Sequence, residues 1–343
     1  MKICILGNTT GNIDEGMKKI TFNIARELSK NHDILTLNPL EVFSWDFWRA
    51  IKNFKPQIIH YIPGPSIKSF ILVKTLSIYL KDAKTIISAT HPGFYGIRGF
   101  SYGLSYALSS ILKNFVPLLK PDLILTQSYD SEEMFKSMGC KTEFLPNGVR
   151  ADKFVPVSAD IKERLREKYR IDKRKFVLLH VGPIKRERNI QIFKKLQGHG
   201  NQVIIAGSTS TGMEDDLIQE LRDQGCLIWT GYHQNIEDVY ALSDCFVFPA
   251  MIGMSSIELP LSVMEAMSCN LPVISTRFGA LNRAFPGEDG LIFVDKEDDF
   301  LQGIEKIKNG NIEIRTREKV LLYSWENIVK RLEETYERVL YEL

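Results

Sequence analysis

The chain has 343 residues, of which 44% are hydrophobic and 25% charged, ordinary values for a globular protein that buries sizeable cores. This length favours two domains over one. The net charge is only +2, the pI is about 8.1, and the basic residues are not interleaved with aromatic ones, which argues against a nucleic-acid partner.

Short apolar runs alternate with segments of helical periodicity along the whole chain. The first helical segment places Met17, Ile20, Ile24 and Leu28 on one face, as in an amphipathic helix. The runs predicted as strands are 2–7, 33–37, 57–62, 85–90, 123–128, 142–146, 176–182, 202–207, 226–232, 245–250, 272–276 and 291–294. Strands this apolar, separated by helices, predict parallel sheets that are covered on both faces.

The alternation pauses at 146–175, which is charged and rich in turn residues, and then restarts. This predicts an α/β fold of two doubly wound domains in tandem, with a hinge near 150–172. The closing segment carries an apolar stripe of Trp325, Ile328, Leu332, Tyr336 and Leu340 and predicts an amphipathic helix. Because ligands of such sheets bind at the carboxyl ends of the strands, we expect the site in a cleft between the domains.

The charge distribution and the cysteine content indicate in which cellular environment the protein works. Residues 1–150 contain 18 Lys and Arg against 12 Asp and Glu. This basic first half would suit an anionic acceptor or a membrane surface, although chance scatter explains it equally well. The apolar segment 99–112 is too short to span a bilayer, and Met1–Gly7 reads as a strand rather than a signal peptide. Five cysteines without CxxC spacing favour a reducing compartment over disulfides or zinc.

Two glycine-containing turns are candidate anion sites. The loop 7–16 does not fit GxGxxG, but Gly16 would allow close backbone approach at a helix start, unless the glycines serve only the turn. In the second half a predicted strand ends at Gly182, and three cations follow it: Lys185, Arg186 and Arg188. Three cations at the carboxyl end of a buried strand suit a diphosphate, and the alternative is a solvated loop.

The remaining motifs are weaker or absent. His91 follows a predicted strand directly, where site residues concentrate, although a lone histidine is more often structural. Glu258 and Glu265 lie seven positions apart. No DxD pair is present, which disfavours metal-dependent phosphate chemistry, and GxSxG, Walker A and HExxH are absent too.

Several linked segments resemble, in order and spacing, the retaining glycosyltransferases of family 4 (glycosyl transferases group 1), which have the GT-B fold. The segments that carry the resemblance are PNGVRADKF (146–154), HVGPIKRERN (180–189), VIIAGS (203–208), IWTGYHQNIEDVYALSDCFVFPA (228–250), MEAMSCNLPVISTRFGA (264–280) and YSWENIVKRLEETY (323–336). The resemblance covers essentially the whole chain. It implies two Rossmann-like domains that face a cleft: an acceptor-side domain at 1–150, a nucleotide-sugar domain at 151–320, and a C-terminal helix at 321–343 that crosses back to the first domain.

The resemblance also implies roles for individual residues. Arg188 would pair with the donor diphosphate, Glu265 would accept hydrogen bonds from the donor ribose, and His91 would lie beside the donor sugar and acceptor. Arg188, His91 and Glu258 are thus the predicted catalytic residues. The predicted donor-binding residues are Gly16, Gly182, Lys185, Arg186, Arg188, Tyr232, Glu258, Leu259 and Glu265.

Three positions depart from the family pattern. Pro183 stands where the family has a phosphate-binding arginine, so that Lys185 or Arg186 would have to compensate. Ile257 stands at the first glutamate of the family pair, which places Glu258 one residue out of register, and Arg283 replaces an acid. All three concern donor recognition.

The sequence thus predicts a retaining, metal-independent glycosyltransferase that moves a hexose from a nucleoside diphosphate sugar to a glycan or lipid-linked acceptor. We expect no cofactor besides the donor substrate, no nucleic acid, and a cytoplasmic protein with possible peripheral contact at the inner face of the cell membrane. Two alternatives stay open: a GT-B-like sugar-nucleotide epimerase or phosphorolytic enzyme, and a degenerate, non-catalytic GT-B subunit.

Overall fold

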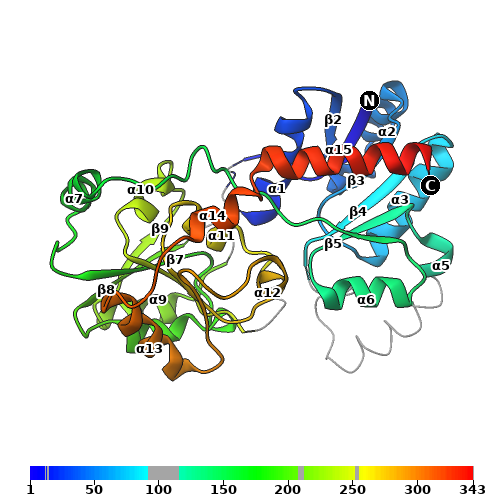
Figure 1. Cartoon of the computed structure of the whole chain (residues 1–343). Coiled ribbons are helices and arrows are strands. Elements are labelled where there is room, and N and C mark those ends of the chain that lie inside the picture. The colour runs from blue at the N-terminus through cyan, green and yellow to red at the C-terminus, as the bar shows by residue number, and fades with distance from the viewer. Residues whose placement is uncertain (12, 14, 92–115, 208–211, 252–254, 343) are drawn as a thin grey trace. The chain divides into compact units, whose positions relative to one another are not determined.

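The computed structural model describes residues 1–11, 13, 15–91, 116–207, 212–251 and 255–342, and the chain forms two compact units (Figure 1). Unit 1 consists of Met1–Asn147, Ile257–Leu259 and Trp325–Leu343, and unit 2 of Gly148–Ser256 and Pro260–Ser324. Three residues from the middle of the second half, and the C-terminal helix, therefore belong to the first unit.

Unit 1 is built on a parallel sheet of six strands. Their spatial order is β2 (Asp33–Leu37), β1 (Lys2–Leu6), β3 (Ile58–Tyr61), β4 (Lys84–Ala89), β5 (Leu123–Thr126) and β6 (Thr142–Phe144). The central strands are rich in isoleucine and almost fully buried, as expected of strands covered by helices on both faces.

The helices of unit 1 bury one apolar face each. They are α1 (Gly16–Leu28), the short 3₁₀ helix η1 (Pro39–Glu41), α2 (Trp45–Phe54), α3 (Ile67–Leu80), α5 (Val116–Leu119), α6 (Tyr129–Ser137) and α15 (Trp325–Tyr341). Helix α15, red in Figure 1, packs against α1 although it follows all of unit 2 in the sequence. Serine side chains accept hydrogen bonds from the first-turn amides of α2, α3 and α6, at Ser44, Ser66 and Ser128.

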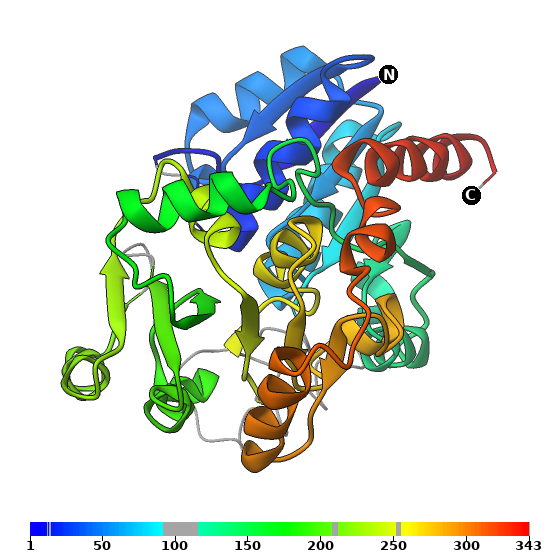
Figure 2. The same cartoon turned by 60° about the vertical axis from the view of Figure 1, so that its left-hand side comes forward.

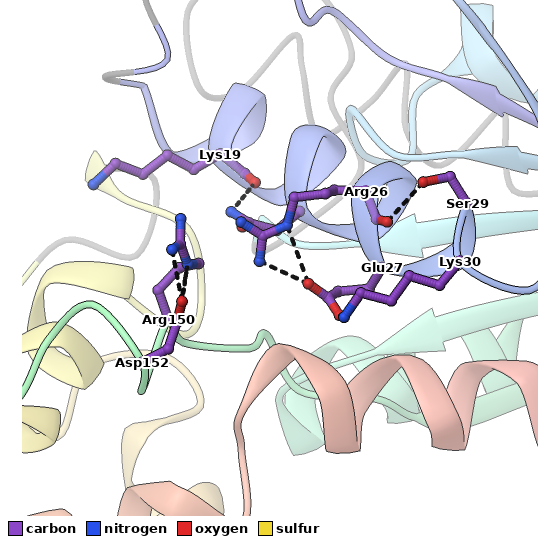
Figure 3. Close-up of polar contacts among 8 residues, drawn as sticks. Lys19, Arg26, Glu27, Ser29, Lys30, Arg150 and Asp152 are labelled. Atoms are coloured by element: carbon purple, nitrogen blue, oxygen red, sulfur yellow. Dashed lines mark hydrogen bonds and ion pairs between the residues drawn. The ribbon is translucent and has the colours of Figure 1, made fainter.

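Helix α1 carries a buried carboxylate that is satisfied by one cation of the helix and one just beyond its end (Figure 3). Glu27 is 7% exposed; Arg26 donates to it at 2.6 Å and Lys30 pairs with its other oxygen. Burial alone would raise the pKa of Glu27, but the hydrogen bonds from Lys30 and Arg26 hold it below its ordinary value. In unit 2, Figure 3 shows Arg150 forming a two-pronged pair with Asp152, with the shorter N–O distance 2.7 Å.

Unit 2 repeats the architecture with a second parallel sheet of six strands. Their order is β12 (Leu291–Phe293), β11 (Val273–Ser275), β10 (Cys245–Phe248), β7 (Phe176–Val181), β8 (Asn201–Gly207) and β9 (Leu227–Thr230). The helices are α7 (Ala159–Lys168), η2 (Arg186–Arg188), η3 (Ile190–Ile192), α8 (Phe193–Leu196), α9 (Asp215–Asp223), α10 (Ile236–Ala241), α11 (Leu261–Ser268), α12 (Leu281–Ala284), α13 (Glu297–Lys308) and α14 (Thr316–Leu321). Helix α14 packs beside α11 (Figure 2).

The predicted fold class is confirmed. All twelve predicted strands form, with ends that differ from the prediction by at most two residues, and they divide into two parallel sheets. The segment after β7 is less regular than a single helix, because Asn189 takes a left-handed conformation (φ 57°) that separates η2 from η3. The domain limits predicted from the sequence stay a prediction. All five cysteines are buried free thiols.

Candidate functional site

The predicted site residues fall in both units. Gly16, His91, Glu258 and Leu259 belong to unit 1, and Gly182, Lys185, Arg186, Arg188, Tyr232 and Glu265 to unit 2. Within each unit several of them follow the carboxyl end of a strand: His91 follows β4, Gly182 follows β7 and Tyr232 follows β9. Ligands of doubly wound sheets bind at this edge.

Gly182 and Arg188 form the tightest part of the site in unit 2. A Cβ atom placed on Gly182 would lie 2.3 Å from Nη1 of Arg188, and the φ of Gly182 is +154°. Only glycine leaves room for the guanidinium at this point. Nε of Arg188 donates to the Ser255 carbonyl at 3.0 Å, and its guanidinium lies 5.8 Å from the centre of the Phe248 ring.

Arg188 is a buried cation without a carboxylate partner. It is 6% exposed, and no acidic side chain of the described residues lies within ion-pair distance of it. Burial lowers the pKa of Arg188 to about 10. The charge of the neighbouring Glu187 opposes this shift, although Glu187 forms no ion pair with Arg188. A desolvated charge without an ion-pair partner is costly, so a bound anion would be stabilised here. The arrangement therefore suits a phosphate or diphosphate group.

The two other cations of this segment are already engaged. Arg186 pairs with Asp216 at 3.0 Å and with Glu220 at 2.5 Å, both on α9. Lys185, which is half-buried, lies 3.8 Å from Glu187. The compensation for Pro183 that we predicted for Lys185 or Arg186 stays a prediction. Arg186 also lies 3.5 Å from Glu214, so to bind the donor it would have to leave three carboxylates.

Glu265 and Tyr232 differ sharply in exposure. Glu265 lies on α11, is 5% exposed, and accepts a hydrogen bond of 2.8 Å from the hydroxyl of Tyr240. Burial, and then the charge of Glu265, raise the pKa of Tyr240, so its hydroxyl stays a donor. Tyr232, two residues after β9, is 52% exposed and offers its ring to solvent.

Glu258 is fully buried in unit 1 as a cap of helix α6. Its carboxylate accepts from the Ser128 amide at 2.9 Å and from the Ser128 hydroxyl at 2.7 Å, and it also accepts from the Ser131 hydroxyl. Burial raises the pKa of Glu258 even though these hydrogen bonds oppose the rise. To act in catalysis, the carboxylate of Glu258 would have to break these three hydrogen bonds. The catalytic role of Glu258 stays a prediction.

The neighbours of Glu258 are held by the same unit. The Glu258 amide donates to the Thr90 carbonyl at 2.8 Å, and the Leu259 carbonyl accepts from Asn147 at 2.9 Å. Ile257, which replaces the family's first glutamate, lies against the start of α1: a Cβ on Gly16 would be 3.4 Å from its Cδ1. The segment Ile257–Leu259 is thus fixed by backbone and side chain alike.

Two further residues singled out in the sequence can be placed. His91 is half-buried two residues after β4, and Arg283 is half-buried on α12. The apolar segment 99–112 lies outside the described residues. In the described parts of the chain, no three His, Cys, Asp or Glu side chains gather as metal ligands, and no helix is both long and apolar enough to cross a membrane.

Sequence reasoning missed the partners that hold these residues in place. Ser255 and Tyr240, which bind Arg188 and Glu265, carry no motif signal of their own. His180, the next-to-last residue of β7, is fully buried two residues before Gly182. Its polar ring in an otherwise apolar strand was the one signal that could have marked it.

Comparison with known proteins finds similarity to glycosyltransferases. The family model of the glycosyl transferases group 1 matches residues 172–309, which include Gly182, Arg188 and Glu265. The chain is 28% identical over 283 residues to "Uncharacterized glycosyltransferase MJ1059" of Methanocaldococcus jannaschii, covering 78% of this chain and 65% of that protein. It is 32% identical over 124 residues to a phosphatidylinositol N-acetylglucosaminyltransferase subunit of Arabidopsis thaliana, covering 35% and 27%.

A solved structure matches nearly the whole chain in fold. The Anabaena protein Alr3699/HepE, in complex with UDP and glucose, superposes with a TM-score of 0.72 at 14% identity, covering 98% of this chain and 99% of that one. Both relatives are matched over less than two thirds of their own length. The structural likeness shows a shared GT-B fold.

Proposed function

We propose that this chain, whose residues 172–309 match the family model of the glycosyl transferases group 1, transfers a hexose from a nucleoside diphosphate sugar to an acceptor with retention of anomeric configuration. The observation that carries the proposal is the buried Arg188, which forms no ion pair with any described residue, in the space left by Gly182 at the carboxyl end of β7. The solved structure of Alr3699/HepE with UDP and glucose supports a nucleotide sugar as the donor.

Breaking the bond between sugar and phosphate leaves negative charge on the departing diphosphate. A guanidinium held in a dry, preorganised site stabilises that charge as it develops, which lowers the barrier. In this scheme Arg188 supplies the cation and Glu265 accepts from the ribose, while Tyr232 and Leu259 complete the donor contacts. The family resemblance implies that His91 would lie beside the sugar and that Gly16 would admit the donor phosphates. The scheme requires no metal ion.

The acceptor and the two alternative functions are tested together. A panel of UDP-, GDP- and ADP-sugars is screened by thermal shift, because a ligand that binds only the folded state raises the apparent stability. With the donor found, we expect nucleoside diphosphate release only when an acceptor is added. Release without acceptor, or conversion of the donor sugar alone, would favour an epimerase or phosphorolytic enzyme. Absence of any shift would favour a non-catalytic subunit.

We further propose a lipid-linked acceptor and peripheral membrane contact through unit 1. Three large apolar side chains in and beside η1 and the start of α2 are almost fully exposed: Leu40 by 82%, Phe43 by 98% and Trp45 by 89%. Trp48 fixes this loop, because its Nε1 donates to the Val42 carbonyl at 2.7 Å and its ring packs on Tyr79. Aromatic side chains held outward in this way suit the interface of a bilayer.

Two further observations support the lipid acceptor. The excess of cations in residues 1–150 would favour anionic lipids. The Arabidopsis relative, by its name, acts on phosphatidylinositol.

Membrane contact predicts a specific loss in a flotation assay. We expect the full chain to float with vesicles of phosphatidylcholine and phosphatidylglycerol, and the triple variant Leu40→Ser/Phe43→Ser/Trp45→Ser to bind at least about tenfold more weakly, since each buried apolar side chain contributes about 1.5–3 kcal/mol. The matched control is Leu322→Ser in unit 2, which removes another exposed leucine (73%) and should float like the parent. Equal flotation of the triple variant would refute contact through this loop.

A further inference from the structure

A neutral histidine lies beside the buried arginine of unit 2. His180 is 0% exposed. A Cβ atom placed on Gly182 would lie 3.4 Å from Nε2 of His180 and 2.3 Å from Nη1 of Arg188. The imidazole and the guanidinium thus border one small space, which exists because residue 182 has no side chain.

The hydrogen bond of the other ring nitrogen fixes the tautomer of His180. Nδ1 lies 3.0 Å from the Val247 carbonyl, which can only accept, so Nδ1 carries the proton. In the neutral ring Nε2 is then a lone-pair acceptor. This atom is buried and has no hydrogen-bond partner among the described residues. A buried acceptor of this kind costs free energy and calls for an explanation.

The ring is held in its orientation by aromatic neighbours. It stacks on Phe246 and Phe248 with ring centres 6.3 Å away, and it contacts Phe193 at 5.4 Å. Burial, and then the charge of Arg188, lower the pKa of His180 to about 3, so the ring stays neutral at physiological pH.

We propose that His180 is a positioning residue for the diphosphate-binding arginine: its unpartnered Nε2 borders the space at Gly182 that Nη1 of Arg188 also borders, and it accepts from the guanidinium when Arg188 turns to bind the donor phosphates. The inference rests on the proposed function, which makes Arg188 the diphosphate ligand. It adds a residue that touches no substrate and acts through Arg188.

An imidazole suits this task better than a carboxylate. A carboxylate would orient the guanidinium equally well, but it would also neutralise the charge that the diphosphate must find, as Asp216 and Glu220 do for Arg186. A neutral acceptor orients the cation and leaves its full charge available. This explains why Arg188 has a lone pair beside it and no ion pair.

Two amide variants separate positioning from a merely structural role. The amide of His180→Gln places an oxygen where Nε2 was and loses the bond to Val247. His180→Asn keeps a donor for the Val247 carbonyl and cannot reach Arg188. The readout is the dissociation constant of inorganic pyrophosphate, and in parallel of UDP, measured by titration calorimetry on the full chain, with Arg188→Ala as the reference.

We expect His180→Gln to bind pyrophosphate within about threefold of the parent and His180→Asn to bind about tenfold more weakly, as for a lost hydrogen bond to a charged group. In the Arg188→Ala background the two variants should bind alike. The inference is overturned if His180→Asn binds like the parent and His180→Gln does not, or if both variants weaken binding equally while Arg188 is present. If Arg188→Ala leaves the binding of both probes unchanged, the proposed function fails, and this inference with it.

Discussion

Replacement of Arg188 by alanine is expected to lower kcat/KM for sugar transfer at least about 100-fold. Removing one partner of a buried, desolvated charge pair costs about 2–5 kcal/mol, and each 1.4 kcal/mol is a factor of ten. Arg188 meets these conditions, since it is 6% exposed and burial has already lowered its pKa to about 10. The measurement is the initial rate of nucleoside diphosphate release with the donor and acceptor found in the panel.

Two companion variants make the result specific. Arg188→Lys keeps the charge but loses the planar fork that fits two phosphate oxygens, so an intermediate loss of about tenfold is expected. Arg174→Ala removes an arginine of the same unit that is exposed and paired only with Asp172, and its activity should equal that of the parent. Unchanged glycosylation by Arg188→Ala, with intact folding, would instead favour a non-catalytic role for the chain.

Acid is expected to weaken unit 1 through His60. This residue of β3 is fully buried, and its ring nitrogens lie 2.6 Å from the Tyr336 hydroxyl on α15 and 2.7 Å from the Ser88 hydroxyl on β4. Burial lowers the pKa of His60 from 6.5 to about 3. As the pH falls below 6.5, His60 is therefore protonated in the unfolded chain before it is protonated in the folded chain. Stability from His60 is full above that pH and is lost progressively toward pH 3.

The size of this loss follows from the same linkage. At pH 4.5 the penalty is about 3 kcal/mol, with a slope of about 1.4 kcal/mol per pH unit. His60→Gln is expected to be less stable than the parent at pH 7, because it loses a partner of Tyr336, but to lose less stability on acidification. Hydrogen exchange of the β3 and α15 amides between pH 7 and 4.5, corrected for intrinsic exchange, measures this within unit 1. His199→Asn, at an exposed loop, is the control, and equal slopes for His60→Gln and the parent would contradict the prediction.

The fold could be read from local pattern. Twelve apolar runs predicted twelve strands, because a strand buried on both faces must be apolar along its length whatever surrounds it. The closing stripe likewise predicted α15, with Trp325, Ile328, Leu332 and Tyr336 buried. Periodicity reports which face of an element is buried, and this is a property of a few neighbouring residues.

The state of individual charges could not be read in this way. Arg186 and Arg188 are two positions apart and chemically identical, yet α9 supplies carboxylates to the first and none to the second. Asp216 and Glu220 lie 30 and 34 residues further along the chain, so only the packing of α9 decides the pairing.

The glutamate pair shows the same division. The sequence by itself determined that Glu258 and Glu265 lie seven positions apart, and that Ile257 occupies the family's first position. Only the tertiary structure decided that Glu258 is enclosed by Ser128 and Ser131 of unit 1, whereas Glu265 contacts Tyr240 of unit 2. The physical reason is that the burial and hydrogen bonding of a carboxylate depend on the groups that surround it. For Glu258 these groups lie over 100 residues away in the sequence, and no local pattern encodes such contacts.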